Sequence, residues 1–378
     1  MWSEILLVSK IYQPTNSELL VSCLICQITF VSALASLNKK QTQRMPWLLL
    51  FLCSLTYYWN TDFFQYMEDF YNGMETTGAK EPLYKLLYNF TEPYYIVWRS
   101  IIWGGAVIFY YITAKRLDIS PNYAVYVLIL LYLPLFVYGR VILAMTIYYY
   151  GLSFAMKPVG NNKLVSSILG FTISSVSFFA HRSVLPLIVL FPLLSLPLKR
   201  SYFKWLLIII PFLYFVLQNI FLYFSFGKLA LGGFLESFQA SAERSASGVF
   251  VEERNWKNLT MYWLRNISLY VPIAYLVWNY VRKKILIEEK LSPLLSVSLF
   301  VILFSLIIYW GITIFDTTTL SMRYLNMAGI GECLLLSGLC QRNILKKKTL
   351  NKLVLLGFLT TEINFIVTYL IHGWEIVK

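Results

Sequence analysis

The sequence has few charged residues, two histidines and five cysteines. Of its 378 residues, 13% are charged and 58% are hydrophobic, whereas about 25% of the residues of an average soluble domain are charged. The sequence contains no Walker phosphate loop, no G-x-G-x-x-G and no D-x-D. It therefore lacks the motifs expected of an ATP-driven pump or a cytosolic nucleotide-sugar enzyme, and the absence of D-x-D disfavours a metal-dependent glycosyltransferase. The cysteines all lie in apolar segments, including Cys23-x-x-Cys26, which predicts buried thiols rather than a redox or metal pair.

Apolar runs of about 16 to 22 residues recur along most of the chain, each long enough to cross a hydrocarbon core of about 30 Å as a helix. We therefore predict an all-α, polytopic membrane protein that forms a single transmembrane domain over residues 1–378. The twelve predicted spans are 17–37, 46–60, 95–114, 122–138, 141–156, 164–180, 183–198, 205–226, 266–281, 293–315, 324–341 and 353–371. The first sixteen residues do not resemble a signal peptide, and if they also cross there are thirteen spans.

Basic residues gather after every second predicted span. The clusters are Lys39, Lys40 and Arg44; Lys115 and Arg116; Lys157 and Lys163; Lys199, Arg200 and Lys204; Arg282, Lys283, Lys284 and Lys290; and Arg342, Lys346, Lys347, Lys348 and Lys352. This alternation is the positive-inside pattern, so the net charge of +13 indicates membrane topology and not nucleic-acid binding. It places both termini and the two long connections, 61–94 and 227–265, outside the cytoplasm.

The long connections mix aromatic side chains with carboxylates. The first contains Tyr66 and Tyr84 among Asp62, Asp69 and Glu81. Connections of more than about 12–15 residues are usually functional or disordered. This mixture suits sugars, whose C–H faces stack on aromatic rings while their hydroxyls bond to carboxylates. It equally suits an aromatic belt at the membrane interface.

Three arginines at the outer ends of predicted spans run against the charge pattern. Arg140 precedes the span 141–156, Arg182 follows the span 164–180, and a tight hairpin would bring them together; Arg323 precedes the span 324–341. Charge near a membrane tends to be functional, and arginine binds phosphate groups bidentately, so we predict a pyrophosphate site. The alternative is that each arginine reaches lipid headgroups or neutralises a nearby carboxylate.

Three further ionisable residues have two interpretations each. His181 ends an apolar segment beside Arg182, where it fits either a packing residue or a proton acceptor or hydrogen-bond donor. Glu332 and Glu362 lie about midway along predicted spans, where each fits either a proton-relay group or an internal ion-pair partner.

Three segments also occur in a recognisable order. The stretch "TDFFQYMEDFYNGMETTGAKEPLYKLLYNF" contains D-x-x-x-Y (Asp62, Tyr66) and E-P-L-Y from Glu81; "GRVILAM" begins with Gly139 and Arg140; "FFAHRSVLPLIVL" contains His181. Together, over about 60–190, they resemble the EpsG-like polysaccharide polymerases, which are similar to the Wzy-type polymerases of O-antigen and capsule. Val141 departs from the glutamine that family members often have.

The resemblance implies a GT-C-like helical bundle in the bacterial inner membrane, with its active site facing outward. The reaction it implies moves a growing glycan from undecaprenyl pyrophosphate to a repeat unit on the same lipid carrier, with no metal or cofactor. Its partners are then these lipid-linked glycans, membrane lipid and a chain-length regulator. The implied site residues are Arg140, Arg182, Arg323, Tyr66 and Glu81 for substrate binding, and His181, Asp62 or Asp69 as the base.

Two other functions fit the composition. A flippase for lipid-linked sugars should have two similar halves, short outer loops and charges deep in its spans, whereas this chain has long outer loops and charges at the outer ends. An O-antigen ligase would use the same lipid carrier and would share the arginines.

Overall fold

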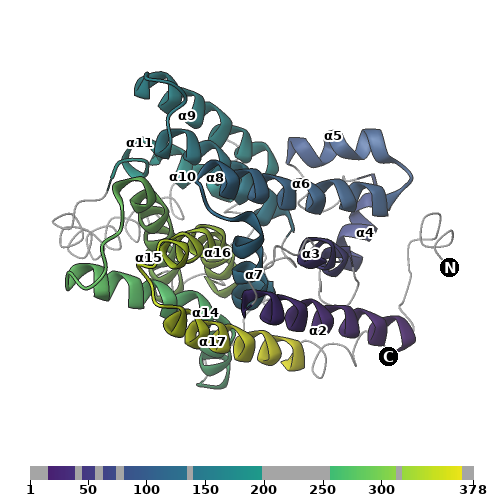
Figure 1. The fold of residues 1–378 in the computed structure, drawn as a ribbon. Helices are drawn as coiled ribbons and strands as arrows, with labels where there is room; N and C mark the ends of the chain where they lie inside the picture. The colour runs from purple at the N-terminus through teal and green to yellow at the C-terminus, as the bar shows by residue number, and fades with distance from the viewer. Residues whose placement is uncertain are drawn as a thin grey trace.

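A computed structural model describes residues 16–38, 45–55, 63–73, 81–133, 139–197, 256–311 and 317–367. Every regular element in these ranges is helical, which confirms the predicted all-α class (Figure 1). The helices are α2 (Asn16–Asn38), α3 (Met45–Leu55), α4 (Phe63–Tyr71), α5 (Pro82–Thr91), α6 (Tyr95–Arg116), α7 (Pro121–Tyr132), α8 (Gly139–Met156), α9 (Lys163–Ala180), η2 (Arg182–Val184), α10 (Leu185–Val189), α11 (Phe191–Leu194), α14 (Trp256–Val281), η3 (Glu289–Leu291), α15 (Ser292–Gly311), α16 (Thr317–Gln341) and α17 (Lys347–Val367).

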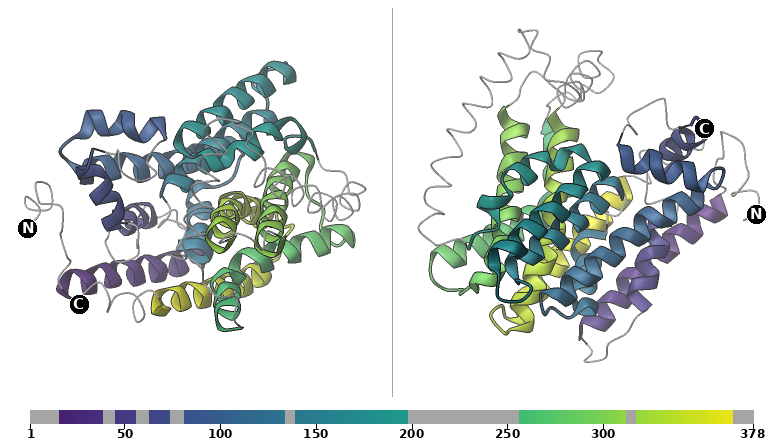
Figure 2. Two further views of the ribbon diagram at one scale, coloured as in Figure 1. Left: turned by 180° about the vertical axis from the view of Figure 1, so that it is seen from behind. Right: turned by 90° about the horizontal axis from the view of Figure 1, so that it is seen from above.

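Most predicted spans coincide with one of these helices, and the long helices run along a common diagonal when seen from above (Figure 2, right). Within the described ranges, Tyr95–Arg116, Lys163–Ala180 and Glu289–Leu306 are long and apolar enough to cross a membrane. Leu24–Leu37 and Pro121–Tyr132 are shorter apolar helices. The span 205–226 lies outside the described residues, so the number of twelve crossings stays a prediction.

Some predicted spans differ from the helices of the structure. The span 183–198 is not one helix but the succession of η2, α10 and α11. Pro186 and Pro192 have no backbone N–H to donate to a preceding turn, and each lies in the first turn of a new short helix. The helices expected to begin at 266 and 324 begin at Trp256 and Thr317. Arg323 therefore lies in the second turn of α16 and not before its start.

The connection 61–94 contains two short helices instead of an open loop. Helix α4 buries Tyr66 and Phe70 and packs against α6, and α5 buries Tyr84 and packs against both α6 and α9. Leu86 and Phe90 of α5 are exposed, with 79% of Phe90 accessible. Because one face is buried and the other is apolar and exposed, α5 has the character of a helix that lies at a membrane interface.

Helices α8 and α9 form an antiparallel hairpin whose backbones approach closely. A Cβ atom on Gly151 of α8 would come within 2.6 Å of the carbonyl oxygen of Gly170 on α9, and one on Gly170 would come equally close to the oxygen of Gly151. Ser174 of α9 strengthens the contact by donating from its hydroxyl to the oxygen of Tyr148 at 3.0 Å. The hairpin fixes the start of α8 beside the end of α9.

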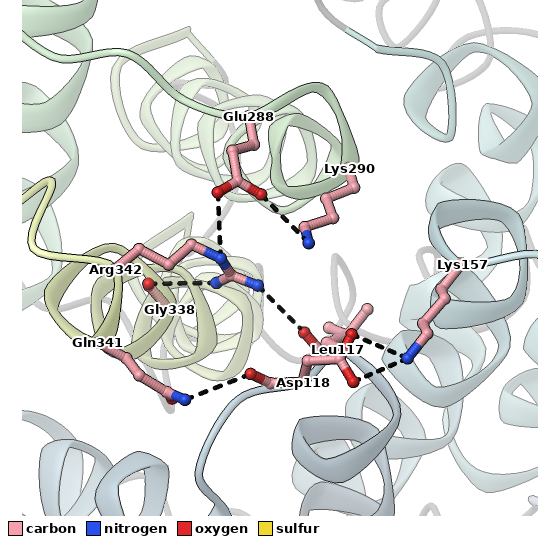
Figure 3. A network of polar contacts seen from close by, with 8 residues as sticks. All are labelled: Leu117, Asp118, Lys157, Glu288, Lys290, Gly338, Gln341 and Arg342. Atoms are coloured by element: carbon pink, nitrogen blue, oxygen red, sulfur yellow. Dashed lines mark hydrogen bonds and ion pairs between the residues drawn. The ribbon is translucent and has the colours of Figure 1, made fainter.

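Four connections that the charge pattern assigns to the cytoplasm meet at one end of the bundle (Figure 3). Arg342, after α16, pairs with Glu288 at 3.2 Å and donates to the oxygen of Leu117 at 3.4 Å. Lys157, after α8, binds both carboxylate oxygens of Asp118 at 2.8 Å, and this hydrogen bond lowers the pKa of Asp118 below its ordinary value. We call this the basic end and the opposite end of the bundle the outer end.

Candidate functional site

Three segments of the chain converge on Arg140 at the outer end. Its Nε donates to the hydroxyl of Tyr66 at 3.1 Å, and its Nη1 pairs with Oε2 of Glu81 at 3.3 Å. The guanidinium carbon lies 4.7 Å from the centroid of the Tyr66 ring. The hydroxyl of Tyr84 donates to the backbone oxygen of Arg140 at 3.3 Å. The structure thus brings together residues from α4, α5 and α8.

The pair of Arg140 and Glu81 is largely removed from solvent. Their side chains are 19% and 10% exposed, so water screens their attraction less than it would screen a surface ion pair. Burial raises the pKa of Tyr84 well above its ordinary value; Glu81 raises it further, and Arg140 lowers it. The phenol of Tyr84 therefore keeps its proton and remains a hydrogen-bond donor.

An aromatic floor supports the cluster from below. Trp98 of α6 is 1% exposed, and its ring contacts the rings of Tyr66, Tyr84 and Phe70 at centroid distances of 6.5, 5.7 and 5.9 Å. Its indole nitrogen donates to the backbone oxygen of Tyr84 at 3.3 Å. Edge-to-face aromatic contacts add to the stability that burial provides, so the floor limits movement of the two tyrosines.

Arg99 is a second buried arginine of this region, and it was not among the predicted site residues. It is 0% exposed, its guanidinium carbon lies 3.9 Å from the centroid of the Trp103 ring, and its Nη1 donates to the hydroxyl of Tyr95 at 3.3 Å. The same Trp103 ring packs against Gly139, where a Cβ atom would overlap it. The signal was present in the sequence, because Arg99 is a cation near the outer start of a predicted span, just as Arg140 is.

Arg99 and Arg140 lie at about the same height in the bundle. At the basic end, Arg116 of α6 donates to the backbone oxygen of Lys157 at 2.6 Å. Arg99 precedes Arg116 by seventeen residues, and Arg140 precedes Lys157 by the same number. At 1.5 Å per residue both arginines are about 25 Å from the basic end, close to the thickness of a hydrocarbon core.

His181 lies where α9 ends and η2 begins, and it is 7% exposed. Its Nδ1 accepts a hydrogen bond from the backbone N–H of Ser183 at 3.2 Å, which caps η2. In the neutral imidazole the proton is then on Nε2. This geometry favours His181 as a hydrogen-bond donor through Nε2, and its role as a base stays a prediction.

The structure places the other predicted site residues as follows. Arg182 is half-buried in η2, which contacts α8, so it lies in the part of the fold that holds Arg140. Asp69 is buried on α4, one turn after Tyr66. The backbone of Arg323 lies in α16, and its side chain is outside the described residues, as is Asp62.

The side chains that the structure describes here can hold an anion and a polar substrate. In the described ranges no group of three or more histidine, cysteine or acidic side chains could hold a metal ion. The oriented guanidinium of Arg140, beside the hydroxyl groups of Tyr66 and Tyr84, can instead bind negative charge and hydroxyl groups.

The family of the chain follows from its sequence as a whole. The model of the EpsG family matches residues 45–375, which include all three motifs and most of the carboxy-terminal half, so the chain belongs to the EpsG family. This family is implicated in exopolysaccharide biosynthesis. No curated protein and no solved structure matches the chain.

Proposed function

We propose that this member of the EpsG family is a glycosyltransferase that polymerises lipid-linked oligosaccharide repeat units at the outer face of the bacterial inner membrane. The donor is the growing glycan on undecaprenyl pyrophosphate, and the acceptor is one repeat unit on the same carrier. The observation that carries the proposal is the convergence of Tyr66, Glu81 and Arg140 from distant segments at the outer end of the bundle.

The chemistry is a displacement at the anomeric carbon of the donor. The oxygen of an acceptor hydroxyl forms the new glycosidic bond, the bond from that carbon to the pyrophosphate oxygen breaks, and the electron pair leaves with undecaprenyl pyrophosphate. The hydroxyl proton passes to a carboxylate, for which Asp69 and Asp62 are the candidates, or to His181 in its other tautomer. Negative charge grows on the pyrophosphate, so an arginine fixed beside it stabilises the transition state.

Glu81 and Tyr66 position Arg140 in this scheme. They hold the guanidinium in one orientation before the donor arrives, so binding immobilises few additional side-chain torsions. Arg182 and Arg323 are the further cations that we assign to the pyrophosphate. The aromatic residues of α4 and α5 would then contact the sugars of the repeat unit.

The test is polymer formation in vitro from purified lipid-linked repeat units. The wild-type protein should give a ladder of products without ATP or nucleotide sugar, and Arg140→Ala should give at most the unreacted unit. If thermal melting shows that the wild-type preparation is folded and the preparation still forms no polymer, the proposal is contradicted.

The surface glycan of a strain that lacks the protein separates the competing functions. Loss of a polymerase leaves a core that carries one repeat unit. Loss of a ligase leaves a bare core with polymer retained on the lipid carrier, and loss of a flippase leaves neither product. The first pattern is the one that we expect.

A further inference from the structure

Arg99 lies where a charged side chain is costly. It is in the second turn of α6, one of the helices that are long and apolar enough to cross a membrane, and it is 0% exposed. Charged residues inside transmembrane segments are rare and usually functional. Buried ionic groups contribute little to stability compared with apolar groups of similar volume, so stability alone does not account for this arginine.

The guanidinium group of Arg99 contacts two aromatic side chains of its own helix. Its carbon lies 3.9 Å from the centroid of the Trp103 ring, and its Nη1 donates to the hydroxyl of Tyr95 at 3.3 Å. Both rings are buried, so water does not weaken the attraction between the guanidinium group and the face of Trp103. One planar group therefore holds two rings that are about two turns apart on α6.

The ring of Trp103 limits how closely α8 can approach α6. Gly139 is the first residue of α8 and directly precedes Arg140, and a Cβ atom on Gly139 would overlap three neighbouring atoms of the Trp103 ring. Because glycine has no side chain, the backbone of α8 can lie against this ring. A movement of Trp103 would thus move the start of α8 and the backbone of Arg140.

The ring of Tyr95 connects Arg99 to the aromatic floor. It stacks on Trp98 with a centroid distance of 5.8 Å and an interplanar angle of 25°. Trp98 in turn contacts the two tyrosines that form hydrogen bonds with Arg140. Arg99 therefore holds the backbone of Arg140 through Trp103, and it holds the partners of Arg140 through Tyr95.

The hydrogen bonds of Arg140 tolerate little movement of its backbone. Those to Tyr66 and Glu81 measure 3.1 and 3.3 Å, at or beyond the long end of the usual range. A shift of about 1 Å away from these partners would break both bonds, and a misplacement of this size can lower the rate of a catalysed reaction about 100-fold.

We propose that Arg99 is a positioning residue for Arg140. It fixes the start of α8 relative to the aromatic floor, so that the guanidinium group of Arg140 keeps the orientation in which it meets the pyrophosphate of the donor. Arg99 itself is fully buried and does not touch the donor. The inference rests on the proposed function, because that function assigns the pyrophosphate to Arg140.

Binding of undecaprenyl pyrophosphate to the purified protein tests the proposal without turnover, by titration calorimetry in lipid nanodiscs. Arg99→Lys keeps the charge but lacks the planar group that contacts both rings, so the affinity should fall about tenfold. In a protein that already carries Arg140→Ala, Arg99→Lys should cause no further loss, because Arg99 acts through Arg140. Losses that multiply in the double variant, or a wild-type affinity of Arg99→Lys, would overturn the proposal.

Arg116 provides the matched control on the same helix. Its guanidinium carbon also lies over an aromatic ring, 3.8 Å from the centroid of Phe154, but at the basic end. Arg116→Lys should therefore bind undecaprenyl pyrophosphate as tightly as wild type. An equal loss in Arg116→Lys and Arg99→Lys would show a general effect on α6 and would overturn the proposal.

A second set of variants keeps the proposal testable if Arg99→Lys does not fold. Gly139→Ala places a methyl group against the Trp103 ring, and Trp103→Phe replaces this ring by a smaller one, so each should weaken binding about tenfold. The smaller ring leaves room for the methyl group, so the double variant should bind within about threefold of wild type. A double variant that binds more weakly than either single variant would show that this contact does not position α8.

Polymer formation separates this inference from the proposed function. If Arg140→Ala abolishes binding, the Arg99 variants behave as expected and wild type forms no polymer, the proposed function has failed and the positioning role stands. If wild type and Arg140→Ala bind undecaprenyl pyrophosphate equally well, the pyrophosphate is not at Arg140, and both proposals have failed.

Discussion

A guanidinium group that is held from two directions cannot be replaced by an ammonium group. Arg140 donates from Nε to Tyr66 and from Nη1 to Glu81, and these two donors have a fixed angle between them. We expect Arg140→Lys to be nearly as damaging as Arg140→Ala, with turnover lowered about 100-fold or more, because lysine keeps the charge but lacks the planar fork. The measurement is polymer formation in vitro at equal protein amounts.

Lys85 provides the matched control for Arg140. It is an exposed cation on α5, on the same outer helix that carries Tyr84. Lys85→Ala should leave polymer formation near the wild-type level. A full-length ladder from Arg140→Lys would show that Arg140 acts only as a charge near lipid headgroups.

The two ring nitrogens of His181 can be tested separately. The side-chain oxygen of asparagine can take the place of Nδ1, and the amide nitrogen of glutamine can take the place of Nε2. Because Nδ1 caps the N–H of Ser183, His181→Asn should keep thermal stability and lose activity. His181→Gln should lower the melting midpoint and retain more activity. The opposite pattern would mean that Nε2 does not act as a donor.

At the scale of elements, the contact between α8 and α9 holds the start of α8, which carries Arg140, beside the end of α9, which precedes His181. Gly151→Ala places a methyl group within 2.6 Å of the oxygen of Gly170, so it should destabilise the fold by about 1–3 kcal/mol. Gly104→Ala in α6 is the control, because its Cβ atom would meet only Phe51 at an ordinary 3.5 Å. Thermal melting in detergent should show a lower midpoint for the first variant alone. Equal midpoints would mean that the hairpin tolerates a wider spacing.

The sequence predicted the helices well where apolar runs were uninterrupted, as in α6 and α9. It failed where local chemistry competes with hydropathy: Pro186 and Pro192 divide an apolar run, and amphipathic α4 and α5 are too short and too polar to resemble spans. The meeting of Tyr66, Glu81 and Arg140 could be expected only from the order of motifs. Their mutual distances depend on the Trp98 floor and on Gly139, which no local pattern specifies.

At the scale of the whole molecule, alternation of charge gives the bundle two chemically different ends. The basic end gathers Arg342, Glu288, Lys157 and Asp118 from connections that are far apart in the sequence, as the positive-inside pattern requires of connections on one side of a membrane (Figure 3). Arg140 lies at the other end. The two ends of the bundle therefore agree with the positive-inside pattern. Which end faces the cytoplasm stays a prediction.

That orientation can be measured with single cysteines in a variant whose five native cysteines are replaced. Asn89 is exposed on α5 near the outer end, and Lys346 is exposed between α16 and α17 at the basic end. Asn89→Cys should react with a membrane-impermeant maleimide in intact spheroplasts, whereas Lys346→Cys should react only after lysis, because basic connections are retained in the cytoplasm. The reverse labelling would place the Arg140 cluster in the cytoplasm. A glycan on an outward-facing lipid carrier could not reach it there, so the proposed polymerase would be excluded even if the fold were unchanged.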